Sequence, residues 1–317
     1  MLDVLILVAG FVFLIIGADK LVDAASSLAA KMGIPNIVIG LTIVAFGTSA
    51  PELVVNVFAA LEGSTEMVLG NVLGSNIFNV LAILGVSSVI YPLSVKTNTT
   101  WLEIPLSLLA AIAVLVVAND ILFDNAVADY ISRTDGMILL LFFTIFLVYN
   151  LKIAQNNPAD EEETKHYTYL KSGLFIALGL AGLVIGGRLI VTSAVSLAEA
   201  FGLSERVIAL TVVSVGTSLP ELATSIVAVR KQKVDIAIGN VVGSNIFNIF
   251  LILGVSAVVT PLQISANAFF DIAINIAAGM LLFIFIFTGK GRQLSRAEGI
   301  VFLVIYLAYV SFLVTQG

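Results

Sequence analysis

The sequence predicts an all-α membrane protein with ten transmembrane helices, arranged as two inverted-topology repeats of five helices each. Three observations lead to this prediction: an apolar composition, an internal duplication, and an odd number of apolar segments in each copy. Of the 317 residues, 59% are hydrophobic and 11% are charged, whereas a soluble domain carries about 25% charged residues. Apolar segments of about 20 residues recur, long enough to cross a bilayer as helices, and they lack the alternation of β-barrel strands.

The apolar segments divide each half of the chain into five spans, with breaks at charged residues, glycines and prolines. The first half contains the predicted spans 2–25, 36–61, 67–90, 102–118 and 136–152, and the second half 170–195, 204–229, 235–259, 268–288 and 297–315. Because five is odd, the second half enters the membrane from the opposite side, as in many secondary transporters.

The two halves carry the same sequence at a constant offset of 169 residues. The stretch "GTSAPEL" at Gly47 returns as "GTSLPEL" at Gly216, and "GNVLGSNIFN" returns as "GNVVGSNIFN". Polar residues and glycines match best, and contact with lipid does not select them. We therefore predict a first repeat at 1–152, with its motif at about 40–80, and a second repeat at 170–317, with its motif at about 209–249.

The segment 153–169 between the repeats is polar and acidic, and we interpret it as a solvated linker; a regulatory ion site is the alternative. We call the side of the N-terminus side A and the other side B. Among the basic residues in the loops and at the span ends, side A collects only Arg133 and Arg206. Side B collects Lys31, Lys96, Lys152, Lys165, Lys171, Arg230, Lys231, Lys233, Lys290, Arg292 and Arg296. The positive-inside rule then makes side B, with the linker, cytoplasmic and places both termini outside the cell membrane.

The composition also excludes several functions. There is no cysteine, and the single histidine, His166, lies in the polar linker, so thiolate and histidine metal sites are not expected. Net charge is −6 with no basic tail, which argues against a nucleic-acid partner. The loops are too short for a nucleotide-binding domain, and no nucleophile, base and metal converge. We therefore expect no enzyme activity, no cofactor and no ATP, in a monomer embedded in the lipid bilayer.

Each repeat places one glutamate, Glu52 or Glu221, deep inside a span. An ionised carboxylate at that depth costs several kcal/mol and needs a partner or a function. Inverted repeats bring the two glutamates together near the bilayer midplane. A pair of protonated glutamates that only hydrogen-bond between helices is the alternative.

The residues around each glutamate add oxygen atoms. Thr48 and Ser49 lie four and three residues before Glu52, on the same helix face, and Pro51 frees the carbonyl of Gly47 from the helix ladder. The second repeat and the second motif supply further hydroxyl and amide oxygens from Thr217, Ser218, Ser75, Ser244, Asn79 and Asn248. We assign hydrogen bonds at helix ends or between helices to Asn71, Asn76, Asn240 and Asn245; ion binding is the alternative.

An all-oxygen set with two negative charges is typical of a site for hard cations such as Ca²⁺ or Na⁺. Two carboxylates neutralise one Ca²⁺, or instead two Na⁺ or two protons. A site that either set can neutralise, but not both together, predicts an ion exchanger.

The paired motifs resemble the two alpha-repeats of the cation/Ca²⁺ exchanger superfamily, in particular its prokaryotic sodium/calcium exchanger branch. The resemblance implies helices 2, 3, 7 and 8 around the ions, with helices 1 and 6 sliding across them. It implies Na⁺-driven Ca²⁺ extrusion by alternating access, with several Na⁺ per Ca²⁺. It makes Glu52 and Glu221 the Ca²⁺ ligands and gives the six hydroxyls mainly to Na⁺. The main-chain carbonyls of Ala45 and Ser214 and the side chains of Asn79 and Asn248 would contribute.

One residue departs from part of that superfamily. Asn248 stands where some prokaryotic and K⁺-dependent members carry aspartate, which weighs against K⁺ dependence. An H⁺/Ca²⁺ antiporter and a K⁺-dependent Na⁺/Ca²⁺ exchanger are the alternative functions. Three charged residues lie within the first and sixth spans: Asp19 and Lys20 near the side-B end of the first, and Arg188 in the sixth. We interpret them as charges whose side chains reach the membrane interface; a gating role is the alternative.

Overall fold

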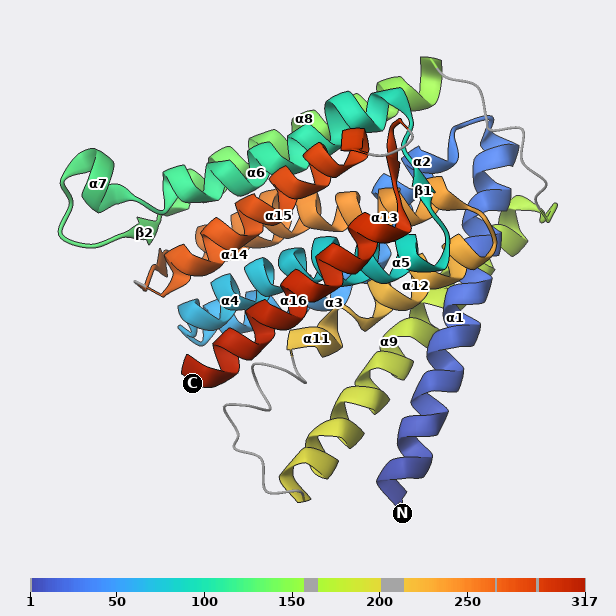
Figure 1. The fold of residues 1–317 in the computed structure, drawn as a ribbon, viewed down its shortest axis with the longest axis horizontal. Coiled ribbons are helices and arrows are strands. Elements are labelled where there is room, and N and C mark those ends of the chain that lie inside the picture. Colours follow the sequence, from blue (N-terminus) through green and yellow to red (C-terminus); the bar gives the residue numbers. More distant parts are fainter. Residues whose placement is uncertain (1, 157–164, 201–213, 266, 289–290, 317) are drawn as a thin grey trace.

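The computed structural model describes residues 2–156, 165–200, 214–265, 267–288 and 291–316. Figure 1 shows a helical bundle in which α1 (Leu2–Met32) and α9 (Tyr169–Ala200) run together along one edge. Their side-A ends project away from the other helices, which lie more nearly parallel to one another in this view. The chain thus separates into a helix pair and a larger bundle.

The rest of the first repeat forms helices joined by short connections. The α-helices are α2 (Asn36–Ile39), α3 (Ala45–Leu61), α4 (Thr65–Ile77), α5 (Leu84–Ile90), α6 (Ile104–Val117), α7 (Asp120–Asp124) and α8 (Arg133–Asn156). The π-helical segments are η1 (Gly40–Val44), η2 (Phe78–Ile83) and η3 (Thr99–Glu103), and the strands are β1 (Leu93–Ser94) and β2 (Tyr130–Ile131).

The second repeat follows the same plan. Its further α-helices are α11 (Ser214–Thr217), α12 (Leu219–Arg230), α13 (Val234–Ile246), α14 (Gly254–Val259), α15 (Ala268–Thr288) and α16 (Arg296–Gln316). Its π-helical segment is η5 (Phe247–Leu253), and its strands are β3 (Leu262–Gln263) and β4 (Gln293–Leu294).

Nine candidate membrane spans occur within the described residues, each long and apolar enough to cross a bilayer. The predicted seventh span, 204–229, lies partly outside them, and α11 and α12 form its described part. The predicted end of the first span at residue 25 is wrong, because α1 continues to Met32. Helix α8 likewise runs to Asn156, inside the segment predicted as linker, and 157–164 lie outside the described residues.

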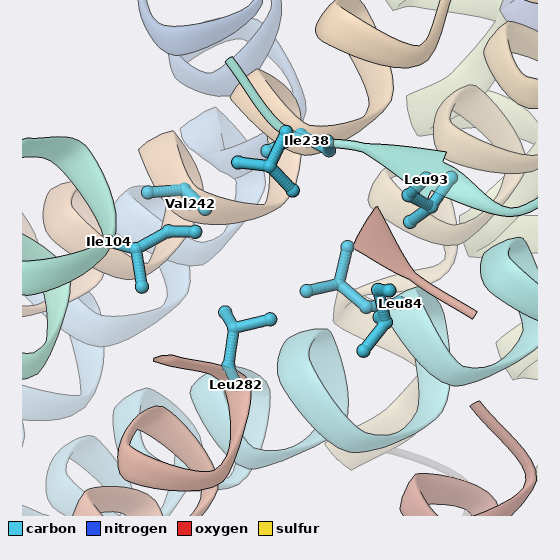
Figure 2. A pocket seen from close by; sticks show the side chains of 8 residues that line it. Leu84, Leu93, Ile104, Ile238, Val242 and Leu282 are labelled. Atoms are coloured by element: carbon cyan, nitrogen blue, oxygen red, sulfur yellow. The ribbon is translucent and has the colours of Figure 1, made fainter. Parts of the chain in front are cut away.

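The spans Thr65–Ile90 and Val234–Val259 lie at the centre, since most of each is buried inside protein, whereas the outer spans mainly face the surroundings. Apolar side chains from α5, β1, α6, α13 and α15 converge around a cavity of only about 10 Å³ (Figure 2). Leu84, Ile104 and Val242 are among them. This close packing fixes the central helices against one another.

Short antiparallel strands tie the repeats together at both ends. On side B, β1 pairs with β4 through Leu93 and Leu294; on side A, β2 pairs with β3 through Ile131 and Leu262. Each pair therefore joins one loop of the first repeat to one loop of the second, which helps to hold the bundle together.

Glycines bring α1 and α9 into backbone contact. A methyl group added to Gly17 would lie 2.7 Å from the carbonyl oxygen of Gly179, and one added to Gly186 would lie 2.7 Å from that of Gly10. Small residues permit this close approach in membrane helices. The two helices therefore form one unit, packed more closely on each other than on the bundle.

Candidate functional site

The two glutamates lie deep in the bundle, Glu52 on α3 and Glu221 on α12, with 2% and 1% of their surfaces exposed. Glu221 accepts a hydrogen bond from Ser49, which precedes Glu52 by three residues on α3. The structure therefore brings the helix segments that carry the two glutamates into contact, as the inverted repeats predicted.

Serine hydroxyls from both repeats surround the carboxylate of Glu221. The Ser49 hydroxyl donates to Glu221 Oε1 at 2.9 Å, and the Ser244 hydroxyl lies 3.4 Å from the same oxygen. Ser49 and Ser244 are themselves 2.9 Å apart, and the matching pair, Ser218 and Ser75, is 3.1 Å apart. Four of the predicted hydroxyls thus meet as two pairs. One pair joins α3 to α13, and the other joins the residue before α12 to α4.

The predicted threonines also contact the opposite repeat. The Thr48 hydroxyl donates to Asn240 Oδ1 at 3.0 Å, and the Thr217 hydroxyl donates to Asn71 Oδ1 at 3.2 Å. The two bonds are equivalent, because Thr217 is the counterpart of Thr48 in the second repeat and Asn71 is the counterpart of Asn240 in the first. Asn71 and Asn240 therefore act as interhelical hydrogen-bond residues, as their positions in the motif predicted.

A third matched pair of bonds joins the central helices. The Asn79 amide donates to Asn245 Oδ1 at 3.0 Å, and the Asn248 amide donates to Asn76 Oδ1 at 2.9 Å. Asn79 and Asn248 lie in η2 and η5, which begin at equivalent positions of the two repeats. Such π-helical segments often occur at functional sites, and the sequence analysis did not predict them.

Several buried oxygens of these residues have no hydrogen-bond donor within the described part of the chain. They are Glu52 Oε2, Glu221 Oε2, Asn79 Oδ1 and Asn248 Oδ1. A buried carboxylate oxygen without a donor costs free energy. A bound cation removes that cost, and oxygen atoms of this kind are the ligands that hard cations prefer.

The backbone near the two prolines differs between the repeats. Helix α3 continues through Pro51, whereas the second repeat breaks at Ser218, between α11 and α12. The Ala45 carbonyl, directly after η1, accepts a hydrogen bond from Thr48 at 3.3 Å. Ser214 is the first residue of α11. Both repeats carry a proline directly before the glutamate, but within the described residues only the helix of the second repeat is interrupted there.

A further asymmetry escaped the sequence analysis. The main-chain carbonyl of Glu52 accepts from Asn56 on its own helix at 2.7 Å, while that of Glu221 accepts from Asn240 on α13 at 3.2 Å. Asn240 also donates to Ser225, the counterpart of Asn56, at 3.0 Å. An asparagine one turn after Glu52, inside an apolar span, was the signal that could have revealed this difference.

Comparison with known proteins identifies the type of molecule. Residues 2–152 and 171–315 match the family described as "Sodium/calcium exchanger protein". The chain belongs to this family. It is 34% identical over 348 residues to the sodium/calcium exchanger MaX1 of Methanosarcina acetivorans, covering 96% of this chain and 97% of MaX1. It is 36% identical to the putative antiporter CaxA of Alkalimonas amylolytica, covering 95% of each.

Solved structures of the sodium-calcium exchanger NCX_Mj have the same fold. One of them, soaked with Na⁺ and Sr²⁺, superposes with a TM-score of 0.84 at 31% identity and covers 98% of both chains. This exchanger-family chain is thus an all-α protein of ten membrane helices in two inverted repeats. It is a multi-pass membrane antiporter of the sodium/calcium exchanger type, with ions as its substrates, and not an enzyme.

Proposed function

We propose that this antiporter extrudes Ca²⁺ from the cell in exchange for Na⁺, and that Glu52 and Glu221 bind the Ca²⁺. The observation that carries the proposal is the pair of neighbouring buried carboxylates, each with one oxygen that lacks a donor in the described chain. The side-chain hydrogen-bond partners of these carboxylates among the described residues are hydroxyls, with no lysine or arginine to neutralise them. The ionised site therefore requires cations.

Charge balance explains why exchange is obligatory. One Ca²⁺ neutralises both carboxylates, so bound Na⁺ must leave before Ca²⁺ can enter, and the reverse holds on the other face. The hydroxyl pairs Ser49–Ser244 and Ser218–Ser75, together with Thr48 and Thr217, are suited to Na⁺, which takes uncharged oxygen ligands. Carbonyls of Ala45 and Ser214 and amide oxygens of Asn79 and Asn248 complete the proposed ligand set.

We place side B in the cytoplasm and both termini outside the cell membrane, because the basic residues of the loops and span ends gather on side B. The repeats occupy 1–152 and 170–317, joined by the cytoplasmic segment 153–169, and the matched contacts between Ser49 and Ser244 and between Ser218 and Ser75 support this division. A monomer contains the whole proposed ion site, and amides at Asn79 and Asn248 leave no third acid for K⁺-dependent exchange.

The coupling ion is tested in vesicles that contain the purified protein. The vesicles contain Na⁺ and are diluted into Na⁺-free buffer that contains radioactive Ca²⁺, with pH equal on both sides and the membrane potential clamped. The outward Na⁺ gradient is expected to drive Ca²⁺ uptake. A second arm applies a pH gradient in Na⁺-free buffer. Uptake only in the second arm would replace the proposal with an H⁺/Ca²⁺ antiporter, in which protons neutralise Glu52 and Glu221.

A further inference from the structure

A lysine in the turn between α12 and α13 holds α1 to the bundle on side B. Lys231 Nζ lies 2.6 Å from Asp19 Oδ1 and 2.7 Å from Asp23 Oδ1, both on α1, and 3.0 Å from the main-chain oxygen of Asp19. Lys20 lies 4.0 Å from Asp19, and Lys165 lies 2.6 Å from Asp23. We call the contact of Lys231 with Asp19 and Asp23 the side-B latch.

The repeat offset maps this latch onto a second pair of opposite charges. Lys231 corresponds to Glu62, and Asp19 corresponds to Arg188, so both signs are inverted and the attraction is kept. Lys231 and Glu62 each follow the last residue of their helix, α12 and α3. The next residues, Gln232 and Gly63, both have positive φ, so the two turns share a geometry. We call Glu62 and Arg188 the side-A pair.

The side-A pair is open in this structure, since no ion pair joins these two described residues. Instead, Arg188 lines a cavity of about 650 Å³ between α9 and the bundle. Val54 also lines that cavity and is 55% exposed, whereas its counterpart on the other side, Ala223, is only 7% exposed. The helix pair therefore lies tightly against the bundle on side B and stands away from it on side A, as Figure 1 also shows.

Inverted repeats explain how the opposite state arises. If the two repeats exchange conformations, each contact in one state becomes its counterpart, shifted by the repeat offset, in the other. Helices α1 and α9 are suited to move together, because their glycines pack backbone against backbone. Under this exchange the contact between Lys231 and Asp19 opens, and Glu62 meets Arg188.

We propose that the side-B latch and the side-A pair are alternate latches of the transport cycle, and that Glu62 and Arg188 form a salt bridge when the protein opens to side B. This inference rests on the alternating access of the proposed function. Each ion pair stabilises one state, and the loss of one is offset by the formation of the other. The two states thereby stay close in free energy, which a rapid cycle requires.

The latches are not equal in composition. Asp23 in the side-B latch has an uncharged counterpart, Thr192, in α9, so the side-B latch holds an additional carboxylate. The Asp23 carboxylate also raises the pKa of the Lys165 ammonium, which keeps that ion pair charged at neutral pH. With an extra carboxylate and an extra lysine on side B, the resting protein favours closure on that side.

Side-specific labelling of introduced cysteines tests the proposal, because the chain has no native cysteine. Ala223→Cys reports opening to side B and Val54→Cys reports opening to side A, each probed with a membrane-impermeant maleimide in vesicles of known orientation. Adding Lys231→Gln is expected to raise the labelling rate of Ala223→Cys from side B about five- to tenfold, as the loss of a partly buried ion pair implies. Lys231→Arg should retain the low rate of the parent.

Variants of the side-A pair test whether Glu62 and Arg188 form a salt bridge in the state open to side B. Glu62→Gln should lower labelling of Ala223→Cys from side B and raise that of Val54→Cys from side A, and the exchange of charges in Glu62→Arg with Arg188→Glu should restore the parent rates. Glu66→Gln, four residues along on the same side, is the matched control and should change neither rate.

Unchanged labelling with Lys231→Gln would overturn the side-B latch, and unchanged labelling with Glu62→Gln, or no restoration by the charge exchange, would overturn the side-A pair. Labelling needs no ion gradient, so it is read independently of transport. A protein that shows the labelling shifts but no Na⁺-driven Ca²⁺ flux would refute the proposed coupling and leave the latches standing.

Discussion

Replacement of Glu221 by glutamine separates the charge of the proposed ion site from its hydrogen bonds. The Oε1 atom of Glu221 lies 2.9 Å from the Ser49 hydroxyl and 3.4 Å from that of Ser244, and a glutamine oxygen can accept both bonds. The other carboxylate oxygen, which has no donor in the described chain, becomes an amide nitrogen. The change therefore removes one negative charge and leaves the local packing almost intact.

The expected loss of Ca²⁺ affinity is large. Two unit charges about 4 Å apart interact by about 4 kcal/mol at an effective dielectric constant of about 20. Because each 1.4 kcal/mol is a tenfold change, this gives about a thousandfold weaker binding. The free energy of unfolding should stay unchanged or rise, since a buried carboxylate no longer has to be desolvated when no ion is bound.

Binding is measured as the Ca²⁺ concentration that half-saturates Na⁺-driven radioactive Ca²⁺ uptake, and folding is measured by thermal unfolding in detergent. Glu66→Gln removes a carboxylate outside the proposed site and serves as the control, with uptake as in the parent. Glu221→Asp keeps the negative charge but has a side chain shorter by one methylene. Its Ca²⁺ affinity should therefore lie between that of the parent and that of Glu221→Gln. Parent-like uptake by Glu221→Gln, in a protein of parent-like stability, would refute the assignment of Glu221 as a Ca²⁺ ligand.

Two further predictions concern stability, both measured by thermal unfolding in detergent. Gly239→Ala should destabilise by about 1–3 kcal/mol, because its new carbon would lie 2.9 Å from backbone atoms of α2 and η1; Gly173→Ala, with no described atom within 4 Å, should be neutral or stabilising. Tyr149→Phe removes the 2.6 Å hydrogen bond to the fully buried Glu103 and should cost about 1–3 kcal/mol, whereas Tyr130→Phe, at an exposed position, should cost little. Equal effects within either pair would contradict the packing described for it.

Much of this protein is determined by the sequence itself. Lipid solvates any apolar side chain, so matching polar residues and glycines in two apolar halves indicate a constraint other than membrane insertion. The matched residues around Glu52 and Glu221 predicted a shared oxygen site and inverted topology, and the hydrogen bond from Ser49 on α3 to Glu221 agrees with a shared site. The positions of charges along the chain likewise predicted the spans, apart from ends such as Met32 that short-range patterns define poorly.

Only the tertiary structure decided what differs between two nearly identical halves. Both repeats carry a proline directly before the glutamate, yet α3 continues through Pro51 whereas the second repeat breaks at Ser218, between α11 and α12. The contact of Lys231 with Asp19 is another example, because these residues lie 212 positions apart and meet only when α1 packs on the turn after α12. The local sequence is the same in both states of the protein, so it does not determine which of two symmetry-related contacts is formed. The packing of whole helices determines it.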